Sequence, residues 1–476
     1  TAMSRQAPST DALVADVCYR TLKDYLIEST GLAYYLDKDS ELAEKIVNRL
    51  EALNMSGCSA YLALLKDGQA GEAELDELVA DLTIGETYFF RHEEQFDALR
   101  QTILPDVIRR NAARRQIRIW SAGCATGAEV YSLSILLHRE FAGQLAGWDV
   151  SIVGTDINRK FLAQAREGQF GDWALRSTGE EVKSACFVQS TRSWRIRDEY
   201  REGIALQYHN LVKHPYPSLL HNLAAFDLIL CRNVMIYFSH EVIRDCVNRF
   251  WNSLVDGGWL LVGHAEFNPE VFRAFHTINA PGTVLFARTG EQPKQPVYRM
   301  DGWVTESAAP ATAPWQPPSL SDLPLLLRRP PIAPEAADAS SVPGDPLTAQ
   351  IRELADRAQW EKAGALCQML IDKDNLNPLG HFYHALVLEQ MGQRQEAEGA
   401  LNRAIYLDRD FVLAHYHKGL LLQNGEDLAG AARSFRNVLA LLRPMASDRR
   451  FAEADGISAA DLVELAQMQL EVLEGV

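Results

Sequence analysis

Two glycines four positions apart, Gly123 and Gly127, mark the stretch of this chain best suited to hold a ligand. An alternating apolar run, Ile117–Ser121, precedes them and predicts a strand, and the residues from Glu129 to about Glu140 predict a helix. A strand, a tight glycine turn and a helix start together bring backbone N–H groups close to a bound molecule. The glycine pattern alone is weak, because many such turns bind nothing, so the segments that follow decide its meaning.

Two later strands carry polar residues at the ends where ligands bind. Val150–Asn158 predicts a buried strand with Asp156 at its carboxyl end. In doubly wound α/β folds, an acid at this place accepts hydrogen bonds from ribose hydroxyls. Phe226–Phe238 predicts a strand that runs directly into the polar pair Arg232 and Asn233. Both strands therefore indicate a nucleotide-type ligand at the carboxyl edge of a sheet.

The predicted fold class is α/β, with a doubly wound, Rossmann-like sheet. A turn and late strand at Asp256–His264 and a last, antiparallel strand at Thr283–Phe286 complete this sheet. A small antiparallel β-subdomain is expected at about residues 186–208, with strands at Phe187–Gln189, Trp194–Arg197 and Ile204–Leu206. These elements together predict a ligand-binding domain over residues 83–288.

Five motifs of the chain point to one family. They are Gly85–Arg91, Trp120–Glu129, Thr155–Ile157, His209–Leu211 and Cys231–Phe238. Together they closely resemble the CheR-type chemoreceptor glutamate methyltransferases, which use S-adenosylmethionine, over roughly residues 11–288. The last of the five motifs is specific to that family rather than to methyltransferases at large. The resemblance implies a class I methyltransferase fold and S-adenosylmethionine as methyl donor, with S-adenosylhomocysteine as product; we expect no metal.

The resemblance also implies a role for each residue at the cofactor site. Thr87 and Arg91 would contact the cofactor from the loop before the sheet, and Gly123 belongs to the glycine turn. Glu129 would bind the ammonium or ribose end of the cofactor, and Asp156 the ribose hydroxyls. Asn210 and Leu211 would flank the adenine, and Arg232 and Asn233 would approach the methionine side. A structural interpretation competes at Glu129, because an acid in the first helical turn is favourable without any ligand. Gly85 replaces an asparagine common in the family, so we expect one side-chain contact to the cofactor to be missing.

Arg91 and Tyr237 are the residues we expect to orient the substrate carboxylate, because both offer hydrogen-bond donors. Methyl transfer from a sulfonium needs little acid or base catalysis, since a carboxylate is already a nucleophile. The enzyme has to align the methyl group with the attacking oxygen and remove water from the carboxylate. The structural alternatives are a surface ion pair for Arg91 and a packed core aromatic for Tyr237. Cys124 and Cys231 flank the site, and we expect them to be small apolar fillers rather than nucleophiles.

Residues 11–82 predict a separate N-terminal helical domain, with apolar residues at helical spacing. In the resembled family, one helix of this domain faces the receptor through basic residues. The corresponding stretch here, Asp37–Asn54, carries three basic and five acidic side chains, a net charge of −2. This departs from a basic docking face, and the alternative is a solvated helical cap on the active site.

The C-terminal part of the chain, residues 347–476, carries a 34-residue repeat. His381–Leu388 recurs as His415–Leu422, and the pattern resembles tetratricopeptide repeats, whose stacked helix pairs expose a concave binding face. We expect three units and a capping helix, beginning near Leu347, Asn377, Phe411 and Ala459. The closely spaced histidines of these repeats (His381 and His384, His415 and His417) are expected to be ordinary repeat surface rather than metal ligands. The partner of the repeats, another protein or this chain itself, stays open.

Residues 289–346 predict a Pro/Ala-rich linker, because 12 of the chain's 20 prolines fall between Pro293 and Pro346. Within it, Leu323–Pro331 is apolar enough to dock on a neighbouring surface. A long linker also suggests that the repeats regulate the preceding domain by autoinhibition, which we treat as a hypothesis.

Bulk properties exclude several functional classes. The formal charge of −16 argues against a general binder of nucleic acid or anionic membranes. The seven cysteines include no Cys-x-x-Cys pair, so neither a disulfide framework nor a zinc site is indicated. The chain has no apolar run long enough to enter a membrane and no signal-peptide pattern, so we expect a cytoplasmic protein.

The leading interpretation is an enzyme that methylates glutamate side chains on the cytoplasmic helical bundle of a chemoreceptor. The second is a signalling scaffold whose methyltransferase fold senses S-adenosylmethionine and whose repeats bind a partner. A small-molecule methyltransferase is disfavoured, because it gives no reason for attached protein-binding repeats. The receptor, its glutamates and the signalling output, motility or surface attachment, stay open.

One departure from the family generates a first prediction. Some family members bind a peptide from the receptor's C-terminus by adding it as a strand to the β-subdomain, which has a longer, glycine-containing turn. This chain has only Ser190–Ser193 there. We predict that titration of the chain with a receptor tail peptide gives no binding signal by calorimetry. Saturable binding of that peptide would contradict the prediction.

Overall fold

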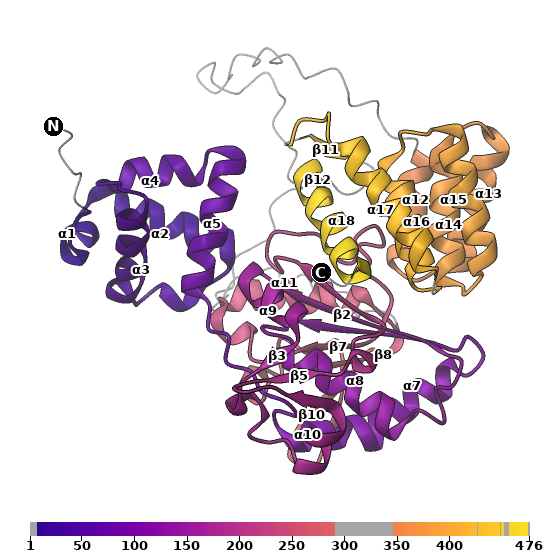
Figure 1. The fold of residues 1–476 in the computed structure, drawn as a ribbon, viewed down its shortest axis with the longest axis horizontal. Helices are drawn as coiled ribbons and strands as arrows, with labels where there is room; N and C mark the ends of the chain where they lie inside the picture. Colours follow the sequence, from indigo (N-terminus) through magenta and orange to yellow (C-terminus); the bar gives the residue numbers. More distant parts are fainter. Residues whose placement is uncertain (1–6, 291–345, 426, 448, 452–456, 475–476) are drawn as a thin grey trace, which may run out of the picture. The chain divides into compact units, whose positions relative to one another are not determined.

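The structure is a computed structural model that describes residues 7–290, 346–425, 427–447, 449–451 and 457–474 (Figure 1). The predicted linker, including Leu323–Pro331, lies almost wholly outside the described residues. No helix in the described part of the chain is both long and apolar enough to cross a membrane.

The N-terminal part is helical, as the sequence predicts. Its helices are α1 (Thr10–Val14), α2 (Val17–Thr30), α3 (Asp39–Ala52), α4 (Cys58–Leu65) and α5 (Gly68–Leu82). Asp16 caps α2 by accepting a hydrogen bond from the backbone N–H of Cys18, and Gly31 ends the helix in the left-handed conformation. The apolar faces of these helices meet in one small core, in which Leu22, Ile46 and Tyr61 are fully buried.

A seven-stranded sheet forms the centre of the next part. The strands are β1 (Gln116–Ala122), β2 (Asp149–Asp156), β6 (Ile204–Tyr208), β7 (Phe226–Cys231), β8 (Leu254–Val262), β9 (His276–Ala280) and β10 (Thr283–Ala287). Their order is β6-β2-β1-β7-β8-β10-β9; β10 pairs antiparallel with both β8 and β9, and the other neighbouring strands pair in parallel. The chain extends the sheet from β1 in one direction through β2 and β6, and in the other through β7 and β8. The point between β1 and β7 is therefore a topological switch point, where doubly wound sheets bind ligands.

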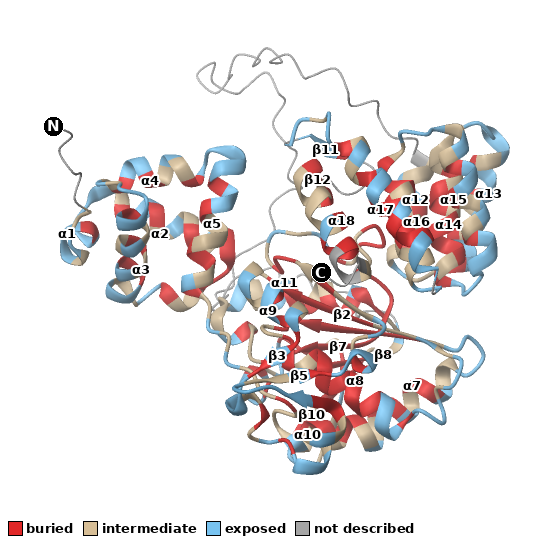
Figure 2. Ribbon diagram, viewed as in Figure 1, coloured by how far each residue is buried: buried red, intermediate tan, exposed pale blue. Residues whose placement is uncertain are grey.

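The sheet is buried on both faces, and Figure 2 shows its strands as mostly buried residues. Along β1, Ile117 and Ile119 pack toward α7 (Leu104–Asn111), α8 (Ala128–Glu140) and α9 (Arg159–Glu167). Trp120 and Ala122 pack on the other face toward α11 (His240–Ser253). This alternation follows from the two-residue period of a strand, and it makes two cores that hold the strand ends in place.

The structure corrects the predicted β-subdomain. Ile204–Leu206 belongs to β6, which pairs in parallel with β2 at the edge of the main sheet, not with the subdomain. The subdomain sheet consists instead of β3 (Gln169–Phe170), β5 (Trp194–Ile196) and β4 (Phe187–Gln189), in this order. The tight turn Ser190–Ser193 joins β4 to β5. The prediction was wrong because a short apolar run does not reveal which sheet it joins. Thr283–Phe286 is the last strand of the main sheet along the chain and is antiparallel, as predicted, and β9 forms the sheet edge beside it.

The C-terminal part shows the predicted repeat in its helices. They are α12 (Pro346–Asp356), α13 (Trp360–Lys373), α14 (Pro378–Gln390), α15 (Arg394–Leu407), α16 (Val412–Gln423), α17 (Leu428–Leu442) and α18 (Ala459–Glu474). The second helices of the three pairs begin at Trp360, Arg394 and Leu428, each 34 residues after the last. His381 and His415, both partly exposed, make the same contact, from Nε2 to the backbone carbonyl six residues earlier. His417 is instead buried against the ring of Phe382, so the predicted surface position was wrong for this residue.

Candidate functional site

All ten residues that the sequence predicts for the site line one cavity, whose volume is about 1130 Å³ with its solvent-open mouth included. They are Thr87, Arg91, Gly123, Glu129, Asp156, Asn210, Leu211, Arg232, Asn233 and Tyr237. The cavity opens at the carboxyl ends of β1, β2 and β7, beside the switch point of the sheet. Segments far apart in the sequence thus meet where this fold class binds its ligands.

The glycine turn forms one wall of the cavity. Gly123 (φ 80°) and Gly127 (φ 88°) both adopt the left-handed conformation, which a side chain strains. A Cβ atom on Gly123 would overlap the side chain of Val234, in the loop that follows β7. Only a glycine lets the β1–α8 turn and this loop approach so closely, so both can contact the same ligand.

Asp156 lies at the end of β2 with a buried carboxylate. Its two oxygens accept hydrogen bonds from the backbone N–H groups of Ala125 and Asn158, each at 2.8 Å. Burial raises the pKa of Asp156 to about 6, although these hydrogen bonds oppose the rise. The carboxylate is therefore ionised at neutral pH and fixed in orientation beside the glycine turn.

Glu129 and Arg232 form a buried ion pair at 2.8 Å on the floor of the cavity. The Glu129 carboxylate also accepts a hydrogen bond from the Ser121 hydroxyl at 2.7 Å. The Arg232 guanidinium donates further hydrogen bonds to Gln95 Oε1 at 2.6 Å and to the backbone carbonyl of Arg91. Each charge thus has a partner, which a buried charge requires.

Asn233 has a polar atom that points to a ligand. Its Oδ1 is buried and has no hydrogen-bond partner among the described residues, and its backbone adopts a left-handed φ of 60°. A buried acceptor without a donor is costly, so a bound group with N–H donors would relieve it. The loop around it is held by Glu266, whose carboxylate accepts from the backbone N–H groups of Asn233, Val234, Met235, Ile236 and Gly263 at 2.5–3.3 Å.

Glu266 is a residue that the sequence analysis missed. It follows the strand β8 in the stretch Gly263-His264-Ala265-Glu266, and an acid just beyond a predicted strand end was the available signal. It does not line the cavity but fixes the loop that does. Phe161 was missed as well. Its ring occupies the space that a side chain on Gly85 would enter. Phe161 therefore forms the cavity wall at the place where the asparagine common in the family would lie.

Asn210 and Leu211 contribute to the wall near the N-terminal helices. The Asn210 side chain donates to the carbonyl of Ser29 at 2.8 Å and accepts from the backbone N–H groups of Val212 and Lys213. Its polar atoms are thus used within the protein, and it ties the loop after β6 to the end of α2. Both residues line the cavity, and their contact with the adenine stays a prediction.

Arg91 and Tyr237 lie at the side of the cavity that the N-terminal domain covers. The Arg91 guanidinium donates to the Glu86 carbonyl at 2.8 Å. Burial raises the pKa of Tyr237, while the positive charge of Arg91 opposes this rise, so the hydroxyl keeps its proton at neutral pH. Tyr34 packs edge-on against the Tyr237 ring at 5.8 Å between centroids, and the Lys38 ammonium lies 3.8 Å from the centre of the Tyr34 ring.

Tyr34 and its neighbours are site residues that the sequence analysis did not find. Tyr34, Tyr35 and Leu32 line the cavity and follow the glycine that ends α2. An aromatic pair directly after a helix-ending glycine was the only local signal, and it does not distinguish a cavity wall from a domain core.

Cys124 and Cys231 are as predicted: both are buried, and burial raises the pKa of each thiol well above its usual value, so neither supplies a thiolate.

The residues present suit S-adenosylmethionine. An acid beside the glycine turn matches ribose hydroxyls, while Glu129 and the unpaired Asn233 oxygen match an ammonium group. The fold and this donor set define a methyltransferase that binds S-adenosylmethionine. Consistent with this, the family described as CheR methyltransferase, SAM binding domain, matches residues 85–284.

Relatives confirm the family. The probable chemotaxis protein methyltransferase of Rhizobium etli is 32% identical over 51% of this chain and 89% of its own length. Chemotaxis protein methyltransferase 2 of Vibrio cholerae is 28% identical over 56% of this chain and 91% of its own. The probable biofilm formation methyltransferase WspC of Pseudomonas aeruginosa is 26% identical, over 83% of this chain and 93% of its own length. The chain belongs to the CheR methyltransferase family.

The ionisation of Asp156 gives a prediction for cofactor binding. If the ionised carboxylate accepts hydrogen bonds from the ribose hydroxyls, a pKa of about 6 makes the Kd for S-adenosylmethionine rise as the pH falls. The ionised fraction drops about tenfold between pH 7 and pH 5, and we expect the Kd measured by calorimetry to rise by about the same factor. Asp156→Asn is expected to bind more weakly at pH 7 and to lose the pH dependence. An equally steep pH dependence in the variant would assign the titration to another group.

Proposed function

We propose that this chain is a protein-glutamate O-methyltransferase. It transfers the methyl group of S-adenosylmethionine to glutamate carboxylates on the cytoplasmic helical bundle of a methyl-accepting chemotaxis receptor. The observation that carries the proposal is that Arg91 and Tyr237 share one cavity with the residues suited to the cofactor. The names of the relatives from Rhizobium etli and Vibrio cholerae, both chemotaxis protein methyltransferases, support the same substrate class.

Bound S-adenosylmethionine supplies an electrophilic methyl group on a positively charged sulfur. Asp156 holds the ribose hydroxyls, and Glu129 and Asn233 accept from the ammonium group. We assign Arg232 a supporting role, because its donors already bond to Glu129, Gln95 and a backbone carbonyl. It fixes the Glu129 carboxylate rather than contacting the methionine carboxylate directly, which refines the role expected from the resemblance.

Arg91 and Tyr237 orient the incoming glutamate. A carboxylate has two oxygens, and donors on one of them leave the other free to attack the methyl group in line with the departing sulfur. Donors that bound both oxygens would stabilise the charged substrate, which loses its charge on esterification, and would raise the barrier. Tyr237 keeps its proton at neutral pH and so acts as a donor, not as a base. Tyr34 packs on its ring and limits its rotation.

The proposed role of Arg91 and Tyr237 in orienting the substrate predicts a slower reaction when either residue is replaced. Arg91→Ala is expected to lower kcat by roughly 10²-fold, the loss typical of a reacting group held out of alignment. Tyr237→Phe removes one hydrogen bond to a charged group, and we expect a loss of about 10–100-fold. Calorimetry with S-adenosylmethionine is expected to give a nearly unchanged Kd for Tyr237→Phe. A Kd that rises in proportion to the loss of rate would instead make Tyr237 a cofactor residue.

The test of the proposed function is transfer of a radiolabelled methyl group to a purified cytoplasmic receptor fragment. Mild alkali hydrolyses carboxyl esters, so label that is released as methanol identifies methylated glutamate. A fragment whose methylatable glutamates are replaced by alanine is the matched control. No incorporation into any receptor of the same organism, despite tight cofactor binding, would favour the cofactor-sensing scaffold.

A second output of the pathway is favoured by one relative. WspC aligns over 83% of this chain, a share that extends beyond the methyltransferase domain, and its name assigns it to biofilm formation. We therefore propose surface-associated behaviour, alongside motility, as the response that this methylation adjusts. The repeats would recruit a protein partner through their concave face.

A further inference from the structure

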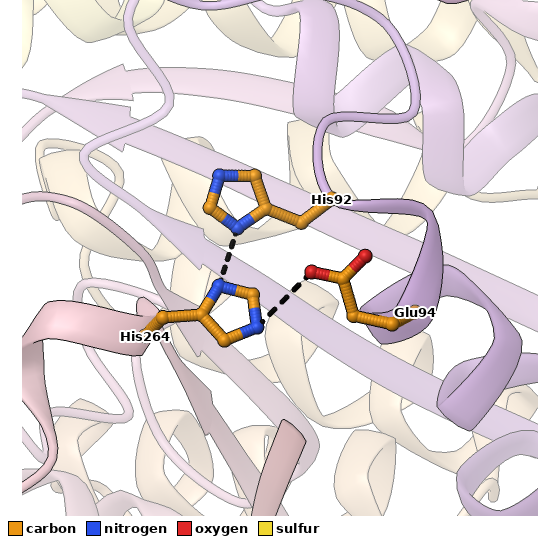
Figure 3. Close-up of side chains that lie close together, drawn as sticks. All are labelled: His92, Glu94 and His264. Carbon is orange, nitrogen blue, oxygen red and sulfur yellow. Dashed lines mark hydrogen bonds and ion pairs between the residues drawn. The ribbon is translucent and has the colours of Figure 1, made fainter. Parts of the chain in front are cut away.

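Two histidines and a glutamate from separate segments meet beside Arg91. His92 directly follows Arg91, Glu94 lies in the first turn of α6 (Glu93–Ala98), and His264 starts the short helix η6 (His264–Glu266) after β8. Figure 3 shows the two imidazole rings facing each other through nitrogen atoms, with the Glu94 carboxylate beside His264. They are the one group of three such side chains, in the described part of the chain, whose ligand atoms converge, one from each residue within 4.8 Å of the others.

The hydrogen bonds of the cluster assign the ring protons. His92 Nδ1 and His264 Nδ1 are 2.6 Å apart, and the two ring planes lie 17° from parallel. His264 Nε2 lies 3.0 Å from the Gly282 carbonyl oxygen and 3.2 Å from Glu94 Oε1, so this nitrogen carries the proton. A histidine that ligates a metal through one nitrogen usually donates from the other to a carbonyl or carboxylate, as His264 does here.

His92 offers the other nitrogen. Because His264 Nδ1 is the acceptor of the 2.6 Å contact and Arg91 Nε donates to His92 Nε2, His92 Nδ1 carries a proton that a metal ion would replace. Its backbone adopts a left-handed φ of 65°, which is uncommon for a residue with a side chain and occurs at sites where geometry is fixed for function. Neutral imidazoles with a carboxylate are a ligand set that zinc accepts in proteins.

We propose that His92, Glu94 and His264 bind a divalent transition metal ion, with Zn²⁺ as the ligand to test. Zn–N bonds of 2.0–2.1 Å in tetrahedral geometry place two ring nitrogens about 3.3 Å apart. The two Nδ1 atoms therefore separate by about 0.7 Å from 2.6 Å, which small side-chain rotations allow. Glu94 turns one carboxylate oxygen to the ion, and a fourth position stays open to water. His264 and Glu94 are 35% and 40% exposed, so the ion can enter from solvent.

The proposal differs from the expectation of no metal, and it does not depend on the proposed reaction. No metal-binding spacing marks these histidines in the sequence, because His92 and His264 are 172 residues apart. The ion would lie next to Arg91, whose Nε is 3.4 Å from His92 Nε2.

The test is calorimetric titration of the full chain, free of any histidine tag and stripped with a chelator, with zinc chloride. We expect one zinc ion per chain, confirmed by elemental analysis after gel filtration. His92→Ala and His264→Ala are each expected to weaken binding at least about tenfold, and Glu94→Gln is expected to weaken it as well. His276→Ala, an exposed histidine at the start of β9, is the matched control and should bind zinc like the unchanged chain.

A second measurement distinguishes the loss of the zinc site from misfolding of a variant. Zinc is expected to raise the Tm of the unchanged chain and of His276→Ala, because an ion that binds only the folded state stabilises it. The Tm of His264→Ala is expected to stay the same when zinc is added. No saturable binding by the unchanged chain, or equal affinity in all the variants, would overturn the proposal. The two histidines would then be only a hydrogen-bonded pair.

Discussion

The site depends on one buried ion pair, between Arg232 at the end of β7 and Glu129 at the start of α8. Through it, three parts of the chain are fixed to each other: the glycine turn by way of Ser121, the helix α6 by way of Gln95, and the Arg91 loop by way of its backbone carbonyl. Removing one partner of such a pair typically costs about 3–5 kcal/mol, since a buried charge is then left alone. The pair holds the Glu129 carboxylate in one position at the cavity wall.

The rest of the site follows the same principle of fixing loops by their backbone. Glu266 gathers the N–H groups of the loop after β7, and Asn210 holds the loop after β6 against α2. Such an arrangement suits a reaction that depends on the alignment of the reacting atoms more than on proton transfer, because fixed loops keep those atoms aligned. The N-terminal helices are part of this arrangement, since Tyr34 completes the wall next to Tyr237.

The comparison of sequence and structure shows which features a linear pattern reveals. The β1–α8 glycine turn, Asp156 and the Arg232-Asn233 pair were predictable, because each lies within one strand–loop unit and its position follows from the fold. The repeat was predictable because its period recurs in the helix starts. Glu266, Tyr34 and the His92–His264 contact were not, because their roles depend on partners far away in the sequence. Ile204–Leu206 was assigned to the wrong sheet for the same reason. The roles of the individual site residues and regulation by the repeats stay predictions.

The central claim is that Arg232 supports cofactor binding only through Glu129. A double-mutant cycle tests it most directly, with the Kd for S-adenosylmethionine measured for Glu129→Gln, Arg232→Met and the double variant. We predict that each single variant weakens binding and that the double variant is no weaker than the weaker single one. Losses that simply add would contradict the claim, and would show that Arg232 acts on the cofactor by another route, by direct contact or through the Arg91 loop that it also holds.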